Sequence, residues 1–240
     1  MKVRVQELLA IMQASKNQIC ELVKKNTNLH EEMSWLYVPK RRKNNICLVA
    51  HIDTVWDDER KNLAYDSKNK VIYSKSKITG IGADDRAGVY SLLKIFCELS
   101  NEEKPYMLFT DYEEFGGLGA FEAVEKFGDI LSDVNFFIEL DRQGSREFVT
   151  YNGEEANKDF MDFVTSFGLH HARGSFSDIA ITGEMLRIAG INVSSGFYFE
   201  HTPQEILYPK IVADSINKVM DIIRNSRNKA FRLPVVERNY

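Results

Sequence analysis

The stretch CLVAHIDTVWDDE, residues 47–59, begins apolar and turns polar within a few residues. Its first four residues are typical of a strand buried inside a sheet, because a strand covered on both faces has apolar side chains at successive positions. His51 and Asp53 follow directly. Alternate residues of an extended segment point to the same side, so we expect these two side chains to lie together. The stretch therefore predicts a core strand that ends at a polar site.

The rest of the chain alternates between helical and strand patterns. Apolar residues at helical spacing predict helices, and short apolar runs predict strands. Helices are expected within residues 2–28 and at 84–100, 116–128, 157–168, 177–190 and 209–227, with Gly168 and Gly190 as C-terminal stops. Strands are expected at 34–38, 45–51, 71–75, 106–111, 134–140 and 146–151, and residues 191–199 are expected to be extended. This alternation predicts one three-layer α/β/α domain over residues 1–240, with a mixed, mostly parallel central sheet.

The composition argues against several classes of protein. The 240 residues carry a net charge of −4 and are 44% hydrophobic, which is enough for one sizeable core. An acidic chain whose one dense basic run is residues 39–43 lacks the basic surface of a nucleic-acid-binding protein. Its three cysteines are far apart and form neither a zinc nor a disulfide pattern. Since no long apolar segment is present, we expect a cytoplasmic protein with no nucleic acid or membrane partner.

Polar side chains follow most of the expected core strands, where ligand sites of such sheets lie. They form five clusters, which are His51 with Asp53, Asp84 with Asp85, Asp111 with Glu113 and Glu114, Asp141, and His201. Each alone has an ordinary structural explanation, such as acids placed at the start of a helix by its dipole. Five together at element ends point instead to one site.

Two histidines and several carboxylates suit zinc, which binds imidazole nitrogen and carboxylate oxygen. A pair of ions needs a carboxylate shared between them. Asp53 is placed to hold one nitrogen of His51 while the other nitrogen binds metal. The residues therefore predict a metal site, and they leave open which of the two adjacent glutamates, Glu113 or Glu114, is a ligand.

Five motifs occur in a characteristic order, and they are AHIDTV (50–55), GIGADDRAGV (80–89), DYEEFGGLGA (111–120), IELD (138–141) and EHTPQE (200–205). Together they resemble the successive metal-site motifs of the di-zinc exopeptidase clan, which includes bacterial leucyl and tetrahedral aminopeptidases, peptidase T and acylase-type zinc carboxypeptidases. The resemblance covers about residues 45–205. It implies a phosphorylase/hydrolase-like zinc peptidase domain.

The resemblance also implies a role for each residue. Asp84 would bridge two zinc ions, with cobalt or manganese as alternatives. His51 and Asp141 would complete one metal site, and Glu114 and His201 the other. Glu113 would be the general base acting on a water between the ions, and Asp53 would stand behind His51. A cis peptide between Asp84 and Asp85 is also expected.

These roles predict an exopeptidase that hydrolyses terminal bonds of short peptides, foremost an aminopeptidase. A carboxypeptidase, or an N-deacylase or amidohydrolase acting on N-acyl amino acids, would use the same metal pair. A catalytically silent binding protein is disfavoured, because none of the ligand or base positions has been lost. The preferred terminal residue stays open.

The chain departs from many clan members in the interval between Asp141 and His201. This interval is too short for a lid or dimerisation domain, so a compact catalytic domain is expected, with loops or a second subunit limiting substrate length. Ser177 is expected to be the N-cap of its helix. Arg142 or Arg173 could bind a substrate carboxylate, but the solvated surface is the favoured expectation for each. Strand alternation predicts that Glu200 points away from the site.

Overall fold

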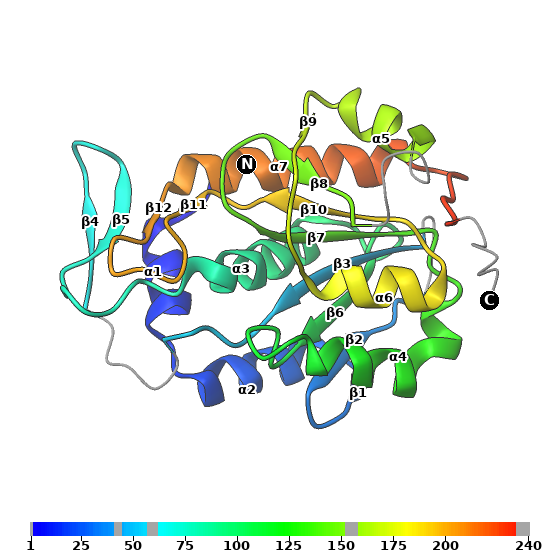
Figure 1. The fold of residues 1–240 in the computed structure, drawn as a ribbon, viewed down its shortest axis with the longest axis horizontal. Coiled ribbons are helices and arrows are strands. Elements are labelled where there is room, and N and C mark those ends of the chain that lie inside the picture. The colour runs from blue at the N-terminus through cyan, green and yellow to red at the C-terminus, as the bar shows by residue number, and fades with distance from the viewer. Residues whose placement is uncertain (1, 41–44, 57–61, 152–157, 234–240) are drawn as a thin grey trace, which may run out of the picture.

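The structure is a computed structural model that describes residues 2–40, 45–56, 62–151 and 158–233. An eight-stranded sheet runs through its middle in the order β1-β2-β6-β3-β7-β10-β8-β9 (Figure 1). These strands are β1 (Leu29–His30), β2 (Ser34–Tyr37), β3 (Ile46–His51), β6 (Tyr106–Thr110), β7 (Phe136–Arg142), β8 (Glu147–Val149), β9 (His170–His171) and β10 (Gly190–Ser194). The four central strands β6, β3, β7 and β10 are parallel, whereas β1, β2 and β8 pair antiparallel to their inner neighbours.

Side-chain alternation along the central strands creates two cores, one on each face of the sheet. In β3, Ile46 and Leu48 belong to one hydrophobic cluster, while Cys47 and Val49 belong to the other. All six residues of β3 are buried. This explains the continuous apolar run at 46–50, because a strand covered on both faces has no solvent side.

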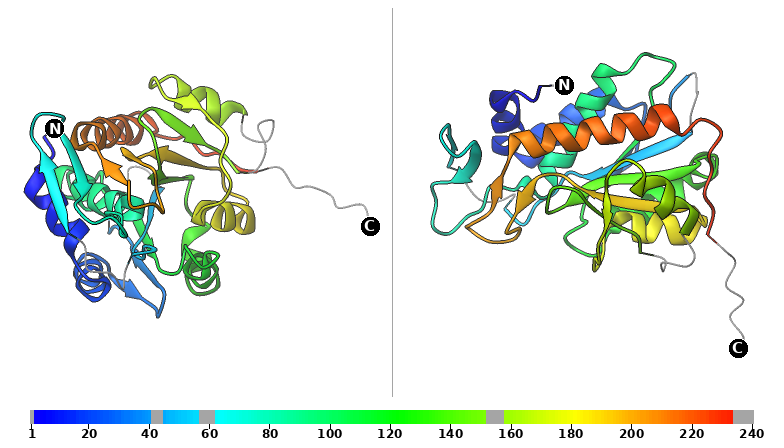
Figure 2. Two further views of the ribbon diagram at one scale, coloured as in Figure 1. Left: turned by 60° about the vertical axis from the view of Figure 1, so that its left-hand side comes forward. Right: turned by 90° about the horizontal axis from the view of Figure 1, so that it is seen from above.

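Helices cover both faces of the sheet. The first core takes apolar residues from α1 (Val5–Gln13), α2 (Lys16–Asn26), α3 (Ala83–Glu98), α5 (Lys158–Thr165) and α7 (Pro209–Asn225). The second core takes them from α4 (Leu118–Leu131) and α6 (Asp178–Leu186). In Figure 2 (right) the orange α7 and the yellow α6 lie on opposite sides of the strands. The predicted three-layer α/β/α architecture is confirmed. Among the described helices, none has the length and apolar character needed to cross a membrane.

A second, four-stranded antiparallel sheet was not predicted. Its order is β11-β12-β5-β4, built from β4 (Leu63–Asp66), β5 (Val71–Ser74), β11 (Phe197–Tyr198) and β12 (Ile206–Leu207). The β4–β5 hairpin projects from one edge of the molecule (Figure 1). Pairing of β12 with β5 joins the segment after His201 to the segment before Asp84, although the two are far apart in the sequence.

Two predicted helix ends are wrong. Helix α4 continues past Gly128 to Leu131, because Phe127 and Leu131 bury their side chains in the second core. Helix α6 ends at Leu186, with Arg187 in the left-handed conformation (φ 58°), and Gly190 instead begins β10. A Cβ atom on Gly190 would lie 3.2 Å from that of Phe137, so this glycine serves close packing. Gly168, at φ +74°, follows α5 as predicted.

Candidate metal centre

The predicted site residues gather at the carboxyl end of the central strands. His51 is the last residue of β3, and it lies beside Thr110, the last residue of β6. Asp141 lies near the end of β7, on the other side of β3. His201 reaches the same place from the loop between β11 and β12. The parallel order of β6, β3 and β7 is what brings these separate stretches of sequence to one edge of the sheet.

Asp84 stands between the two histidines. Its Oδ1 lies 3.1 Å from Nε2 of His51, and its Oδ2 lies 3.1 Å from Nε2 of His201. His51 Nε2 is also 3.4 Å from Asp141 Oδ1, and His201 Nε2 is 3.0 Å from Glu114 Oε2. The five residues therefore form two groups of potential ligands that share the carboxylate of Asp84.

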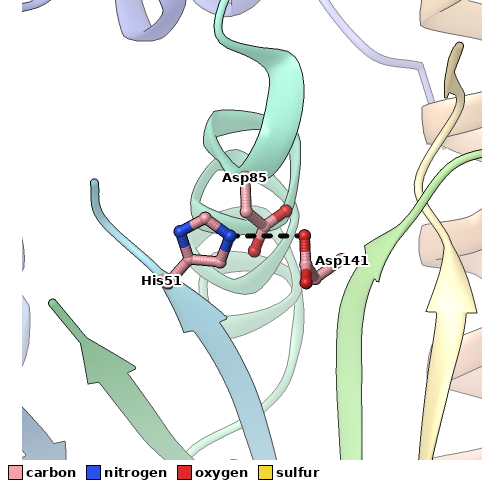
Figure 3. A group of neighbouring side chains, drawn as sticks. All are labelled: His51, Asp85 and Asp141. Carbon is pink, nitrogen blue, oxygen red and sulfur yellow. Dashed lines mark ion pairs between the residues drawn. The ribbon is translucent and has the colours of Figure 1, made fainter. Parts of the chain in front are cut away.

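Asp85 also lies in the site, although the sequence suggested no metal-binding role for it. Figure 3 shows it beside His51 and Asp141, entering from the start of α3. It is fully buried, and its Oδ1 accepts the N–H of Gly88 at 2.9 Å. A side chain at Gly88 would collide with this carboxylate. The Asp84–Asp85 peptide is cis, as the resemblance implied.

The donor set fits divalent cations. Within the described part of the chain, Asp85 Oδ2 is buried and accepts no hydrogen bond, and the buried Asp141 Oδ1 has the ion-pair contact with His51 but no hydrogen bond. Burial raises the pKa of both carboxyls well above the usual range, and the neighbouring Asp84 raises both further. Tetrahedral zinc with bonds of about 2.0–2.2 Å would separate its ligand atoms by about 3.3–3.6 Å. The contacts around Asp84, at 3.0–3.4 Å, are close to that spacing.

The two histidines respond strongly to the surrounding carboxylates. Burial opposes protonation of His51, but Asp141, Asp53 and Asp84 outweigh it and raise its pKa well above the ordinary value. Hydrogen bonds to Asp84 and Glu114 raise the pKa of His201 to about 10. In the absence of metal these imidazoles therefore favour a bound proton at the position where a ligand nitrogen would meet a cation.

Asp53 makes contacts on the far side of His51. Its Oδ1 lies 3.3 Å from Nδ1 of His51. The same carboxylate accepts the backbone N–H groups of Glu113, at 3.2 Å, and Glu114, at 3.3 Å. Asp53 thus holds both the imidazole and the segment that carries the two glutamates. The second of these contacts was not foreseen from the sequence.

Glu113 and Glu114 point to different partners. Glu114 contacts His201, and its side chain is 6% exposed. Glu113 Oε2 lies 4.0 Å from His51 Nε2, with a side chain 12% exposed. Burial raises the pKa of Glu113 to about 7. Tyr112, just before them, has φ 61°, a conformation that is uncommon for non-glycine residues and clusters at functional sites.

A match to the sequence model of a protein family identifies the family of the chain. Residues 35–185, more than half of the chain, match the sequence model of Peptidase family M28. The chain belongs to peptidase family M28. This is a zinc-dependent family, so the protein is a metallo-hydrolase of the expected exopeptidase clan. Among curated proteins, none matches its sequence.

Several solved structures share the fold of this M28 peptidase. Aminopeptidase PepT from Bacillus cereus has a TM-score of 0.71 at 16% identity, over 91% of this chain and 96% of that one. A tripeptidase from Staphylococcus aureus has a TM-score of 0.67 at 14% identity, over 93% and 99%. A leucine aminopeptidase precursor from Bacteroides thetaiotaomicron has a TM-score of 0.61 at 16% identity, over 94% and 98%. At these identities the likeness concerns the fold.

A cavity of about 330 Å³ opens over the candidate metal centre of the M28 peptidase. Besides Asp84, Glu113, Glu114, Asp141 and His201, its lining includes Arg142, Gln143, Tyr151, Phe176, Phe197 and Glu200. The expectation that Glu200 points away from the site is therefore wrong, and Arg142 lines the same cavity. Alternation fails around Glu200 since its neighbours Phe199 and His201 both have φ 61°, so the segment is not extended there. Arg173 is not among the lining residues.

Ser177 is the residue that precedes α6, as predicted, but its side chain does not cap that helix. Its hydroxyl instead donates to Glu139 and lies 3.2 Å from Asp141 Oδ2. Asn192 holds the backbone N–H and carbonyl of Asp141 at 2.9 and 3.2 Å. These buried supports of the M28 peptidase were missed from the sequence, although a glutamate inside the apolar strand IELD was a visible signal.

Proposed function

We propose that this M28 peptidase is an aminopeptidase that removes N-terminal residues from short peptides and uses two zinc ions. The observation that carries the proposal is the placement of Asp84, whose two oxygens face different histidines at equal distances. Asp84 would be the shared ligand. His51 and Asp141 would complete one metal site, and Glu114 and His201 the other.

The chemistry divides between the ions and the protein. When bound, the ions supply Lewis acidity toward the scissile carbonyl and the attacking water. Glu113 would accept the proton of that water and pass it to the departing amine. Asp53 would orient His51 and keep its Nδ1 protonated, which leaves Nε2 free to bind metal.

The cavity supports recognition of an amino terminus. Glu200 is a carboxylate in its lining, and it accepts a hydrogen bond from Gln143 at 2.8 Å. A free ammonium group would be attracted to it. The names of the aminopeptidase and tripeptidase structures agree with this choice. Arg142 favours the second candidate, a carboxypeptidase or a deacylase of N-acyl amino acids, because a guanidinium binds carboxylates.

The proposal also covers the domain organisation, oligomeric state, cellular location and metal of the enzyme. Residues 1–240 would form one catalytic domain without a lid, since the described part of the interval between Asp141 and His201 supplies strands and helices of the main fold. Oligomers are proposed by analogy with the dodecameric PhTET1 structure of the same fold, at a TM-score of 0.60 and 12% identity. Three unpaired cysteines favour the reducing cytoplasm. Cobalt or manganese could replace zinc in the same donor set.

The deciding experiment compares dipeptides with free, N-acetylated and C-amidated ends, in the presence of zinc, cobalt or manganese. The proposal expects turnover to be lost on acetylation and kept on amidation. The opposite pattern would indicate a carboxypeptidase, and a preference for acetylated substrates would indicate a deacylase. A Glu113→Gln protein purified in parallel excludes contaminating peptidases. Absence of both bound metal and turnover would favour a silent binding protein.

A further inference from the structure

Glu205 is a buried carboxylate close to the metal centre that has no part in the proposed catalysis. It is 1% exposed. Its Oε2 accepts the N–H groups of Ile81, at 2.9 Å, and Gly82, at 2.8 Å. Its Oε1 accepts those of Ala83, at 2.8 Å, and Asp84, at 3.1 Å. One side chain thus satisfies four consecutive backbone donors, and the last of them belongs to the shared aspartate.

We propose that Glu205 is a positioning residue, which fixes the backbone of residues 81–84 so that the Asp84 carboxylate faces both histidines. The inference rests on the proposed function, in which Asp84 and His201 bind metal. Glu205 lies four residues after His201, and its own N–H donates to the carbonyl of Thr202 at 3.1 Å. It therefore connects the loop that carries one proposed ligand to the loop that carries another.

The surrounding backbone is shaped around this carboxylate. A Cβ atom on Gly80 would lie 2.6 Å from Glu205 Oε2, so a side chain there would displace it. Gly82 has φ +67°, a left-handed conformation that glycine adopts without steric cost. Directly after Glu205, β12 pairs with β5 through Ile206 and Tyr73. The carboxylate is thus held in place by the second sheet.

The four donors explain why this residue is a carboxylate. Ionised glutamate offers about four acceptor positions on its two oxygens, whereas glutamine offers one oxygen and an NH₂ group that would face two N–H donors. Glu205→Gln would therefore leave one pair of buried N–H groups without an acceptor, which is costly. Aspartate is one methylene shorter and would reach the loop only if the backbone moved.

The first test measures zinc affinity by competition with a chromophoric chelator, at about pH 8 because burial raises the pKa of Glu205 to about 7. Glu205→Gln should bind zinc about 10–100-fold more weakly, the usual cost of losing a group that orients a ligand. Glu122→Gln is the matched control, because Glu122 accepts the N–H of Met33 at 2.8 Å and the hydroxyl of Ser34 at 2.7 Å, away from the proposed ligands. It should lower the melting temperature but keep wild-type zinc affinity.

The second test needs no variant. Amide hydrogen exchange of the wild-type peptide that covers residues 81–84 should be slow even in the metal-free protein, because Glu205 holds these donors without the ions. Random-coil exchange rates there, or a folded Glu205→Gln protein with wild-type zinc affinity, would overturn the inference. A wild-type protein that binds no zinc would instead overturn the proposed function, so the two failures are distinguishable.

Discussion

The Asp53 carboxylate lies 3.3 Å from Nδ1 of His51, on the opposite side of the ring from Asp84, which lies 3.1 Å from Nε2. The backbone carbonyl of Asp53 is also 3.1 Å from Nδ1. Two acceptors at one nitrogen keep a proton on Nδ1, so Nε2 would be the nitrogen available to a cation. This relationship gives a physical reason for the His-x-Asp pattern at the end of β3.

Replacing Asp53 by asparagine should weaken metal binding without removing a proposed ligand. The amide keeps the size of the side chain but loses the charge that increases the basicity of His51 and that attracts the N–H groups of Glu113 and Glu114. Loss of such a partner typically costs about 10–100-fold in metal affinity or activity. Zinc titration of the metal-free Asp53→Asn protein measures this loss of affinity. Asp66→Asn, at the exposed turn of the β4–β5 hairpin, should behave as wild type, and equal affinity in both variants would contradict the role of Asp53.

Glu113→Gln should reduce turnover while leaving bound metal at the wild-type level. The substitution preserves size and every proposed ligand, and it removes the group that accepts a proton. General-base catalysis contributes about 10²–10⁴-fold, so kcat should fall by about that factor. The check is kcat together with the metal content of the same preparation. Near wild-type turnover would show that another group is the base.

Glu114→Ala should have the contrasting phenotype. Its carboxylate lies 3.0 Å from His201, so its removal would take an oxygen from one metal site. We expect reduced metal occupancy and partial recovery of the rate in excess zinc, which should not rescue Glu113→Gln. Metal analysis and zinc titration of activity measure this contrast. If the two variants exchange phenotypes, the order of the glutamate pair has been misassigned but the site stands.

Metal removal should destabilise the fold. Ions that bind only the native state stabilise it by mass action, by about 2.7 kcal/mol when free metal is a hundred times the Kd. Their loss also leaves Asp85 and Asp141 beside Asp84 without a compensating cation, so these two carboxyls favour their protonated forms. We expect a lower melting temperature after chelation and its recovery when zinc is added. An unchanged melting curve, with metal loss verified by elemental analysis, would argue against a bound cation.

Stability of the metal-free protein should decrease as the pH rises from about 5 to 8. Burial raises the pKa of Glu113 from 4.5 to about 7, and Asp84 and Glu114 raise that of His201 from 6.5 to about 10. A raised pKa stabilises the fold below the unfolded-state value, and this stabilisation is lost as the pH rises through the folded-state value. Both groups therefore act in the same direction. The lowered pKa values of Asp53 and Asp84 matter only in more acidic solution.

The zinc-loaded protein is the control for this pH dependence. Metal binds deprotonated ligands, so its affinity increases with pH and opposes the loss of stability. Melting temperatures of metal-free and zinc-loaded samples, measured over the same pH range, should diverge as the pH rises. A metal-free protein that becomes more stable toward pH 8 would contradict the assigned environments of Glu113 and His201.

Local patterns determined the main sheet and the residues that gather at its edge. The apolar run before His51 predicted β3, because a strand that is buried on both faces has apolar residues at successive positions. The same reasoning located β6 and β7, and so placed Glu113, Glu114 and Asp141 at the ends of strands. Helix ends were less accurate, since a glycine such as Gly190 can serve close packing between elements as well as a turn.

Only the tertiary structure decided the surroundings of these residues. The second sheet depends on the pairing of β12 with β5, and Glu205 reaches the N–H of Asp84 across 121 positions of the sequence. Glu200 faces the cavity because two neighbouring residues leave the extended conformation. Such contacts cannot be predicted from periodicity, because periodicity indicates only which side of a single helix or strand is buried. A buried acceptor and its donors come from elements that are far apart in the sequence.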